Sequence, residues 1–226
     1  MAGAGRTIVA VVPVRAGSRR LKNKNMLPFE GESLLARKVR QLKSVRGLAG
    51  VLVSSDSDEM LAEAESLGAA VHRREARYAD DRSVPFGEVV ANVCGAVEAD
   101  DVLWAPCVCP LTDAPQYEEA IRLYRENVPS RNDSLVSFER LKIFLWDGSG
   151  PVNYGLGAGH VLSQDLPDLF RPTNGIFLAP RAKMAEWKYF HGPNPYRYVI
   201  DKRSAVDIDD GLDMACALAW ARLPPV

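Results

Sequence analysis

The sequence predicts a single doubly wound α/β domain with a mostly parallel sheet and a small protruding element. Short apolar, β-branched segments alternate with helix-like segments at the spacing of βαβ units, which places helices on both faces of a parallel sheet. The 226 residues are 47% hydrophobic and 25% charged, which is typical of one globular domain with room for a small addition. We therefore treat residues 1–226 as a single domain.

Each expected strand is a short apolar run between turn residues, and each expected helix carries apolar residues at three- and four-residue spacing. Helix ends are marked by capping side chains and glycines, as where Ser57 or Asp58 begins a helix that Gly68 ends. In chain order the expected strands are 7–12, 50–54, 69–72, 101–105, 134–138, 174–179 and 196–200. The expected helices are 33–43, 59–67, 85–97, 114–127, 181–190 and 210–221, the last with Leu212, Ala215, Cys216, Ala219 and Trp220 facing inward.

The alternation of strands and helices stops in residues 144–170. Residues 147–151 (Asp-Gly-Ser-Gly-Pro) are a strong turn signal, and the segment after them has neither strand nor helix periodicity. We expect residues 144–170 to form an arm that packs against another subunit or closes over a substrate.

Composition excludes several classes of function. The formal net charge of −1 gives no global field for nucleic acid or an acidic membrane, and no apolar run reaches membrane-spanning length. Residues 1–5 are too short for a signal peptide. The four cysteines (Cys94, Cys107, Cys109 and Cys216) lack the neighbouring Cys or His that a zinc site needs, so we expect reduced thiols in a cytoplasmic protein.

A basic loop follows the first expected strand. It holds five cations, and Gly17 and Ser18 add backbone N–H and hydroxyl donors for phosphate oxygens. A solvated surface loop is the alternative, but the position directly after a buried strand favours a phosphate site. No glycine-rich Walker loop, GxGxxG motif or Ser–His–Asp set occurs in the sequence. The cations are Arg15, Arg19, Arg20, Lys22 and Lys24.

An acidic segment near the C-terminus predicts a metal site. In an extended chain Asp207 and Asp209 lie on one face, and paired carboxylates repel each other unless a cation lies between them. Oxygen ligands beside a phosphate site suit Mg²⁺. Alternatively, Asp209 or Asp210 caps the final helix, which is compatible with metal binding by the other carboxylates.

The two motifs together resemble one family. Residues 12–25 (Val-Pro-Val-Arg-Ala-Gly-Ser-Arg-Arg-Leu-Lys-Asn-Lys-Asn) resemble the pattern P-A-R-x-G-S-K-G-L-x-x-K-N of the CMP-sugar synthetases, the acylneuraminate and KDO-type cytidylyltransferases. Residues 207–209 resemble the D-I-D metal motif of that family. Between them, residues 53–56 resemble its S-T-D turn, Arg74 with Asp81 its R-P-x-x-x-x-x-D loop, and residues 174–175 its N-G strand start. The resemblance therefore spans nearly the whole chain.

The resemblance implies a Rossmann-like nucleotidyltransferase fold whose protruding element completes a homodimer. It also implies transfer of CMP from CTP, with Mg²⁺, to a small anionic acceptor. The implied catalytic residues are Arg15, Lys24, Asp207 and Asp209, the two aspartates holding the metal. The implied nucleotide-binding residues are Arg15, Ala16, Gly17, Ser18, Arg19, Lys24, Asn25, Arg74 and Asp81.

The acceptor half departs from the family pattern. Where the family has Q-P-T-S-P-L, residues 105–111 read Ala-Pro-Cys-Val-Cys-Pro-Leu, so an amide and two hydroxyls are replaced. We expect Cys107, Cys109, Gln164 and Asn174 to face the acceptor, which is a nonulosonic or KDO-type sugar acid or a small phosphonate such as phosphonoformate. A non-catalytic nucleotide-binding domain and a nucleotidyltransferase using another base remain as alternatives.

Overall fold

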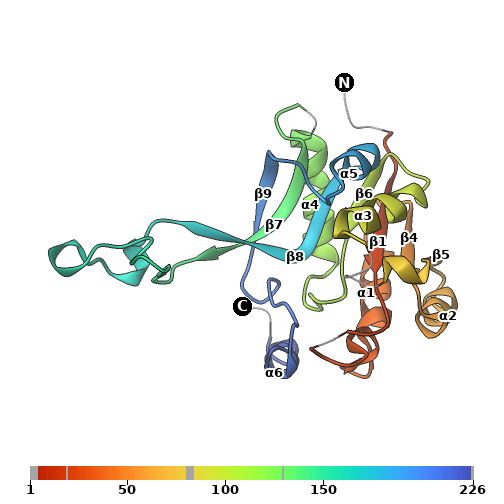
Figure 1. Ribbon diagram of the computed structural model, residues 1–226, viewed down its shortest axis with the longest axis horizontal. Helices are drawn as coiled ribbons and strands as arrows, with labels where there is room; N and C mark the ends of the chain where they lie inside the picture. Colours follow the sequence, from red (N-terminus) through yellow and green to blue (C-terminus); the bar gives the residue numbers. More distant parts are fainter. Residues whose placement is uncertain (1–4, 19, 80–83, 129, 225–226) are drawn as a thin grey trace.

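One seven-stranded sheet organises the protein, as the computed structural model shows (Figure 1). The structure describes residues 5–18, 20–79, 84–128 and 130–224. The strands of this sheet are β1 (Ile8–Pro13), β4 (Gly50–Ser55), β5 (Ala70–Arg73), β6 (Asp101–Trp104), β7 (Ser134–Leu141), β8 (Leu169–Pro180) and β9 (Pro195–Ile200). The helices are α1 (Leu34–Lys43), α2 (Asp58–Ser66), α3 (Phe86–Gly95), α4 (Ala114–Asn127), α5 (Arg181–Trp187) and α6 (Gly211–Ala221).

The strand order is β5-β4-β1-β6-β8-β7-β9. Within it β8 runs antiparallel to β6 and β7, and the other neighbouring pairs are parallel. A small hairpin of β2 (Pro28–Phe29) and β3 (Glu32–Ser33), which the sequence did not reveal, precedes α1. This topology confirms the doubly wound, mostly parallel α/β fold predicted from the alternation of strands and helices.

Helices cover both faces of the sheet, because successive strand residues point to opposite sides. Ala10 and Val12 of β1 pack in the core cluster that contains residues of α1, α2, α4 and α6. Val11, between them, packs in a second cluster with residues of α3 and α5. Because both clusters pack against it, β1 is a central strand buried on both faces, as its unbroken apolar run predicts.

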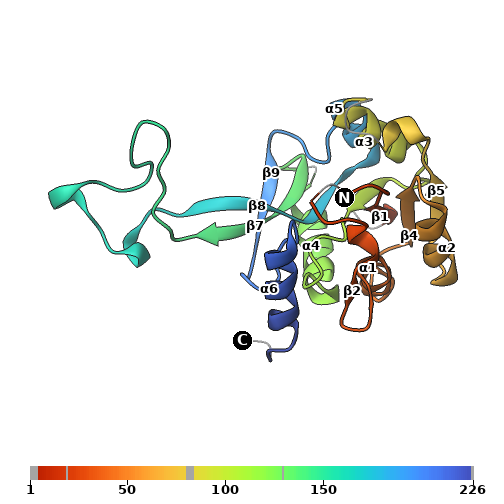
Figure 2. The same ribbon diagram turned by 60° about the horizontal axis from the view of Figure 1, so that its bottom comes forward.

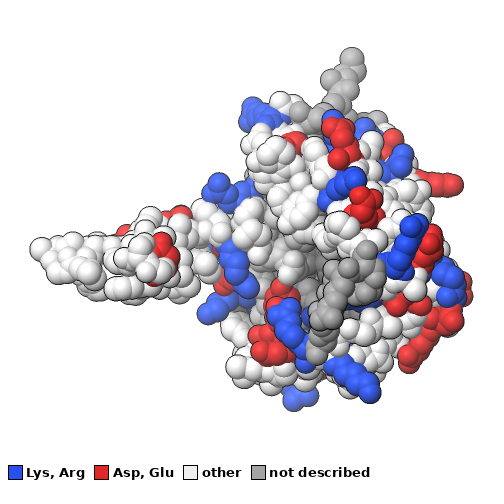
Figure 3. Space-filling view, in the orientation of Figure 1, with Lys and Arg blue, Asp and Glu red and all other residues white. Residues whose placement is uncertain are grey.

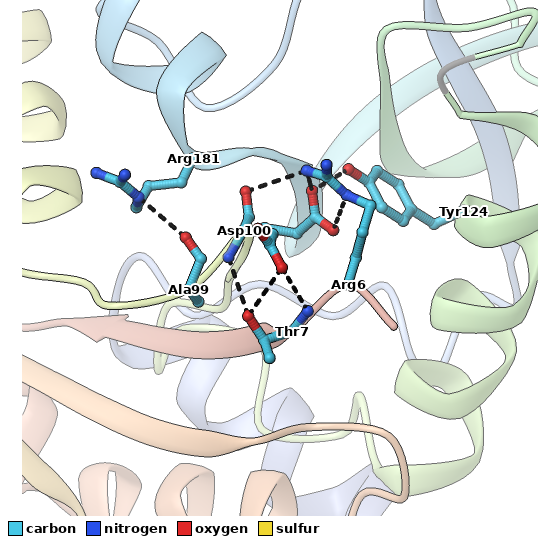
Figure 4. A network of polar contacts seen from close by, with 7 residues as sticks. Arg6, Thr7, Ala99, Asp100, Tyr124 and Arg181 are labelled. Atoms are coloured by element: carbon cyan, nitrogen blue, oxygen red, sulfur yellow. Dashed lines mark hydrogen bonds and ion pairs between the residues drawn. The ribbon is translucent and has the colours of Figure 1, made fainter. Parts of the chain in front are cut away.

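A polar network holds the amino-terminal end of β1 (Figure 4). The buried carboxylate of Asp101 accepts hydrogen bonds from Arg6 Nε (2.9 Å), Arg6 Nη2 (2.6 Å) and Tyr124 Oη (2.8 Å). Beside it, Asp100 accepts from the backbone N–H of Thr7 (2.9 Å). Since Ile8 pairs with Asp101 across the strands, this network sets the register of β1 against β6.

The segment 142–168, which we call the arm, projects from the body beyond β7 and β8 (Figures 1 and 2). At its base, β7 and β8 continue past β9 as a two-stranded ribbon, in which Arg140 pairs with Phe170 and Leu141 with Leu169. Its surface is largely uncharged (Figure 3), and its tryptophan, Trp146, is 61% exposed. Its other exposed large apolar side chains are Ile143, Phe144, Val152, Leu156, Val161 and Leu162.

The prediction of which residues of the last helix face the core is largely wrong. Trp220 packs against the core, but Leu212 is 72% exposed, and Ala215, Cys216 and Ala219 are exposed as well. Instead, Ala217 is the buried residue of α6. An alanine-rich helix has apolar residues on several sides, so its periodicity does not select the face that packs.

Candidate functional site

A pocket of about 570 Å³ lies where β1, β5 and β6 reach their carboxyl ends. This is the edge at which doubly wound α/β folds bind their ligands. One part of the wall is polar and basic, and the other is apolar and aromatic. The polar part comprises Arg15, Ser18, Arg20, Lys24, Asn25, Arg74 and Asn174. The apolar part includes Val84, Phe86, Val89, Trp104, Pro106, Phe177 and Phe190.

The basic loop after β1 is tied to two other loops by hydrogen bonds between residues distant in the sequence. Arg15 donates from Nη1 to the Ala79 carbonyl (2.9 Å), and the N–H of Ala16 donates to Asp56 Oδ1 at 3.0 Å. Gly17 has a φ of 77°, in the left-handed region where a side chain is strained. These contacts place Ser18 and Arg15 on the pocket wall.

The basic loop meets the acidic segment, as the sequence predicted for a phosphate site beside a metal site. Arg20 Nη2 lies 2.7 Å from Asp209 Oδ1, and Lys24 Nζ lies 3.6 Å from the same oxygen. Lys24 also donates to the carbonyl of Ile208 at 2.7 Å. Arg20 and Lys24 line the pocket, and Asp209, almost two hundred positions away in the sequence, lies behind them and is not itself a lining residue.

The carboxylate of Asp207 is only partly satisfied. Its Oδ2 accepts from Asn174 Nδ2 at 2.7 Å, whereas its Oδ1 is buried and has no hydrogen-bond partner. Burial raises the pKa of Asp207, the Asn174 hydrogen bond lowers it, and the nearby charge of Asp209 raises it further. A bound cation would oppose both effects, because a nearby positive charge favours the ionised carboxylate.

The donor set fits Mg²⁺ only with help from a ligand. Among the described residues, no three histidine, cysteine or acidic side chains converge to hold a metal by themselves. Mg²⁺, however, is commonly bound by one or two carboxylates together with substrate phosphates. The orphaned oxygen of Asp207, next to Asp209 and the basic loop, matches that arrangement.

Two further predicted nucleotide residues lie at the other side of the basic loop. Arg74 is 5% exposed and donates from Nη2 to the Val14 carbonyl at 2.5 Å, while its buried Nε has no partner. Burial lowers the pKa of its guanidinium, and the charge of Asp56 raises it. Asn25 is buried beside it and donates weakly to the Arg15 carbonyl (3.4 Å). The unpartnered Nε of Arg74 is a donor available to a ligand.

The aromatic wall is the part of the site that sequence reasoning missed. Trp104 and Phe177 are paired residues of β6 and β8, and the Phe190 ring lies 4.1 Å from that of Phe177. Phe86, at the start of α3, meets Phe190 edge to face at 5.8 Å. These residues are far apart in the sequence, and only the neighbouring positions of β6 and β8 in the sheet bring them together.

The predicted acceptor-binding residues lie in different places. Asn174 lines the pocket. Cys107 and Cys109 are buried in the core, where the desolvated thiol of Cys107 has its pKa raised to about 12. Gln164 lies exposed on the arm, in the short helix η4 (Ser163–Asp165). Within one chain, therefore, Cys107, Cys109 and Gln164 are not part of the pocket wall: both thiols are buried, and that of Cys109 accepts a hydrogen bond from the Asn174 backbone N–H.

Two predicted nucleotide-binding residues, Arg19 and Asp81, lie outside the described residues. Of the described ones, Ala16 and Gly17 are exposed in the basic loop, and Ser18, Lys24, Asn25 and Arg74 line the pocket. No helix in the described part of the chain is long and apolar enough to cross a membrane.

Several known proteins have sequences similar to that of this chain. The chain is 26% identical to the N-acylneuraminate cytidylyltransferase of Escherichia coli O18:K1:H7 (strain RS218 / NMEC), over 93% of this chain but 51% of that protein. The chain thus spans about half the length of that relative. Pseudaminic acid cytidylyltransferase of Campylobacter jejuni (serotype O:2) is 22% identical, over 92% of this chain and 94% of its own.

Solved structures support the same fold. A CMP:2-keto-3-deoxy-manno-octonic acid synthetase in complex with CTP superposes with a TM-score of 0.73 at 14% identity, covering 95% of this chain and 98% of its own. A sequence model described as "Cytidylyltransferase" matches residues 9–136, which is more than half of the 226 residues. The chain belongs to the cytidylyltransferase family.

Proposed function

We propose that the protein is a CTP-dependent cytidylyltransferase that transfers CMP to a small anionic acceptor and releases pyrophosphate. The observation that carries the proposal is the contact between the basic loop and the acidic segment, through Arg20 with Asp209 (2.7 Å) and Lys24 with the Ile208 carbonyl (2.7 Å). In-line nucleotidyl transfer requires cationic side chains that bind the triphosphate and, next to them, carboxylates that bind a metal ion.

In the proposed reaction an acceptor oxygen attacks the α-phosphorus of CTP. The bond from that phosphorus to the oxygen that bridges to the β-phosphate breaks, and pyrophosphate leaves with the electron pair. Arg15, Ser18 and Lys24 bind the phosphate oxygens and neutralise charge that develops on the leaving group. Arg20, whose side chain is 67% exposed, can exchange Asp209 for a phosphate oxygen when nucleotide binds.

Asp207 and Asp209 would hold Mg²⁺ together with the triphosphate oxygens. The metal, when bound, neutralises phosphate charge and lowers the pKa of an acceptor hydroxyl. Asn174 orients Asp207 by donating to Oδ2, which leaves Oδ1 directed to the cation. On the other side of the basic loop, Arg74 and Asn25 would bind the cytosine and its ribose.

The acceptor we propose is a sugar acid of the nonulosonic or KDO type. The similar proteins named above act on N-acylneuraminate and on pseudaminic acid. A small phosphonate such as phosphonoformate is the second candidate, because Ala105 stands where the family pattern has glutamine. An acceptor-binding site that lacks the glutamine amide offers fewer hydrogen bonds to the hydroxyl groups of a sugar acid.

We further propose that two copies form a homodimer through the arm. The arm carries exposed apolar side chains such as Trp146 and Leu156, and α6 exposes Leu212, Ala215 and Cys216. Exposed apolar surface of this extent is typical of an interaction site. All four cysteines are free thiols, which supports a reducing, cytoplasmic location.

A pyrophosphate-release assay tests the activity. The assay compares CTP with ATP, GTP and UTP in the presence of Mg²⁺, against sialic-type acids, KDO-type acids and small phosphonates. Asp209→Asn should abolish release, whereas Asp210→Asn, which keeps the cap of α6, should retain it.

The other outcomes identify the alternatives. Thermal stabilisation by CTP without pyrophosphate release from any acceptor would indicate a non-catalytic nucleotide-binding domain. Release with another nucleotide in preference to CTP would indicate a different base specificity. Full activity of Asp209→Asn would remove the acidic segment from the mechanism.

A further inference from the structure

We infer that Lys38 is a positioning residue for the Asp207–Asp209 carboxylates, acting from the core through the loop between β6 and α4 (residues 105–113). The inference rests on the proposed function only in taking these carboxylates as the metal-binding pair. Lys38 itself lies on α1, on the opposite side of this loop from the acidic segment, and it does not line the pocket.

The ammonium group of Lys38 is fully buried and has three neutral partners. Its Nζ donates to Tyr117 Oη (2.7 Å), to the Cys109 carbonyl (2.9 Å) and to the Thr112 carbonyl at 3.4 Å. Three acceptors match the three N–H groups of an ammonium. A buried cation without a carboxylate partner costs free energy, so an apolar residue would pack here more cheaply. The hydrogen bonds of Lys38 to the loop, and not its packing in the core, therefore explain why a lysine is found here.

Neighbouring side chains of α1 bind the same loop. Gln41 Nε2 donates to the Pro110 carbonyl at 2.8 Å, and Arg37 Nε donates to the same oxygen at 2.9 Å. Consecutive carbonyls of the loop are thus fixed by one helix face. Because two of the loop residues are prolines, the segment is stiff and transmits its position.

The acidic segment is built against the other side of this loop. The N–H of Ile208, which lies between the two aspartates, donates to the Val108 carbonyl at 2.8 Å. Thr112 Oγ1 donates to the Ser204 carbonyl at 2.8 Å. A displacement of the loop would therefore displace the backbone that carries both carboxylates.

A second connection runs through Tyr117. Its hydroxyl accepts from Lys38 and donates to the Gly175 carbonyl at 3.4 Å. The adjacent residue, Asn174, orients Asp207 through the 2.7 Å hydrogen bond to Oδ2. Gly175 packs so closely that an added Cβ would lie 2.9 Å from Thr112 Oγ1, so β8 and the loop move together.

Lys38→Met tests this inference, since methionine fills the space but removes every donor. The matched control is Leu42→Ala, on the same helix and equally buried, which has no polar contact with the loop. Hydrogen exchange measured by mass spectrometry on the full chain follows the peptides that contain residues 105–113 and 204–210. Lys38→Met should speed exchange at the Ile208 amide by about tenfold or more, and Leu42→Ala by less than about threefold.

Metal binding supplies the functional readout. Mn²⁺ titrated in the presence of CTP and followed by electron paramagnetic resonance should bind Lys38→Met about 10- to 100-fold more weakly than the unmodified protein. Leu42→Ala should bind Mn²⁺ normally at temperatures well below its unfolding midpoint.

The outcomes separate this inference from the proposed function. Exchange at Ile208 that is unchanged in Lys38→Met, or raised equally in both variants, would overturn the positioning role. If the unmodified protein binds no Mn²⁺ with CTP present, the metal assignment of the proposed function fails, and the exchange result still decides the role of Lys38.

Discussion

Replacing Lys38 by methionine should remove a pH dependence of stability that the structure assigns to this one side chain. Burial lowers the pKa of Lys38 from 10.5 to about 8 in the native state, and in the unfolded chain the pKa returns to its ordinary value. Between these two pH values the unfolded chain holds a proton that the native protein has released. The free energy of unfolding therefore rises with pH in this window, by about 1.4 kcal/mol per unit at most, and by about 3 kcal/mol in total.

Groups around Lys38 titrate in the opposite sense. Burial raises the pKa of Cys107 to about 12 and raises those of Cys109 and Tyr117 as well, so the native protein keeps protons that the unfolded chain loses. Their contribution lowers stability as the pH rises above about 9. Arg37 and Asp113 are the other charged groups near Lys38. Both proteins share these groups, so the difference between them isolates Lys38.

The assay is urea unfolding of the unmodified protein and Lys38→Met at pH 7, 8, 9 and 10, under reducing conditions. Below pH 8 the difference in unfolding free energy should be constant, and above it the unmodified protein should gain by up to about 3 kcal/mol. A difference that stays constant from pH 7 to pH 10 would refute the reasoning. It would mean that burial does not lower the pKa of Lys38 in the native state.

Four further predictions follow from the site and the fold. Arg15→Ala or Lys24→Ala should lower turnover by about 100-fold or more with folding intact, and near-normal rates in the pyrophosphate assay would contradict a role in transition-state charge stabilisation. Asp207→Asn should weaken Mn²⁺ binding, and in the unmodified protein this binding should fall as the pH drops through the raised pKa of Asp207, which a titration downward from pH 8 would detect. Arg6→Met should lower the free energy of unfolding by about 1–3 kcal/mol without changing KM, because it leaves a buried carboxylate short of partners at the end of β1 away from the pocket. Trp146→Asp should convert the proposed dimer to a monomer in sedimentation experiments, and an unchanged mass would exclude the arm as the interface.

Local pattern was sufficient for much of the fold and for one half of the site. The unbroken apolar run of β1 and its basic loop were recognisable because burial on both faces and phosphate binding both demand particular residue types at consecutive positions. The Asp207–Asp209 pair was recognisable for the same reason. The start of β8 was predicted too late: the strand begins at Leu169, not at 174, because its first residues continue the pairing with β7 as far as Leu141. Residues 170–174 (Phe-Arg-Pro-Thr-Asn) contain no apolar run that would mark them as a strand.

Tertiary structure alone decided the rest. The family pattern pointed to Cys107 and Cys109 as acceptor contacts, but both thiols are buried and absent from the pocket wall, which depends on how the loop packs in the fold. The aromatic wall exists because β6 and β8 are neighbours, which brings Trp104 opposite Phe177. The sequence by itself determined which residues carry a charge, because charge is a property of single side chains. Only the fold decided which of them meet, because distance is a property of pairs.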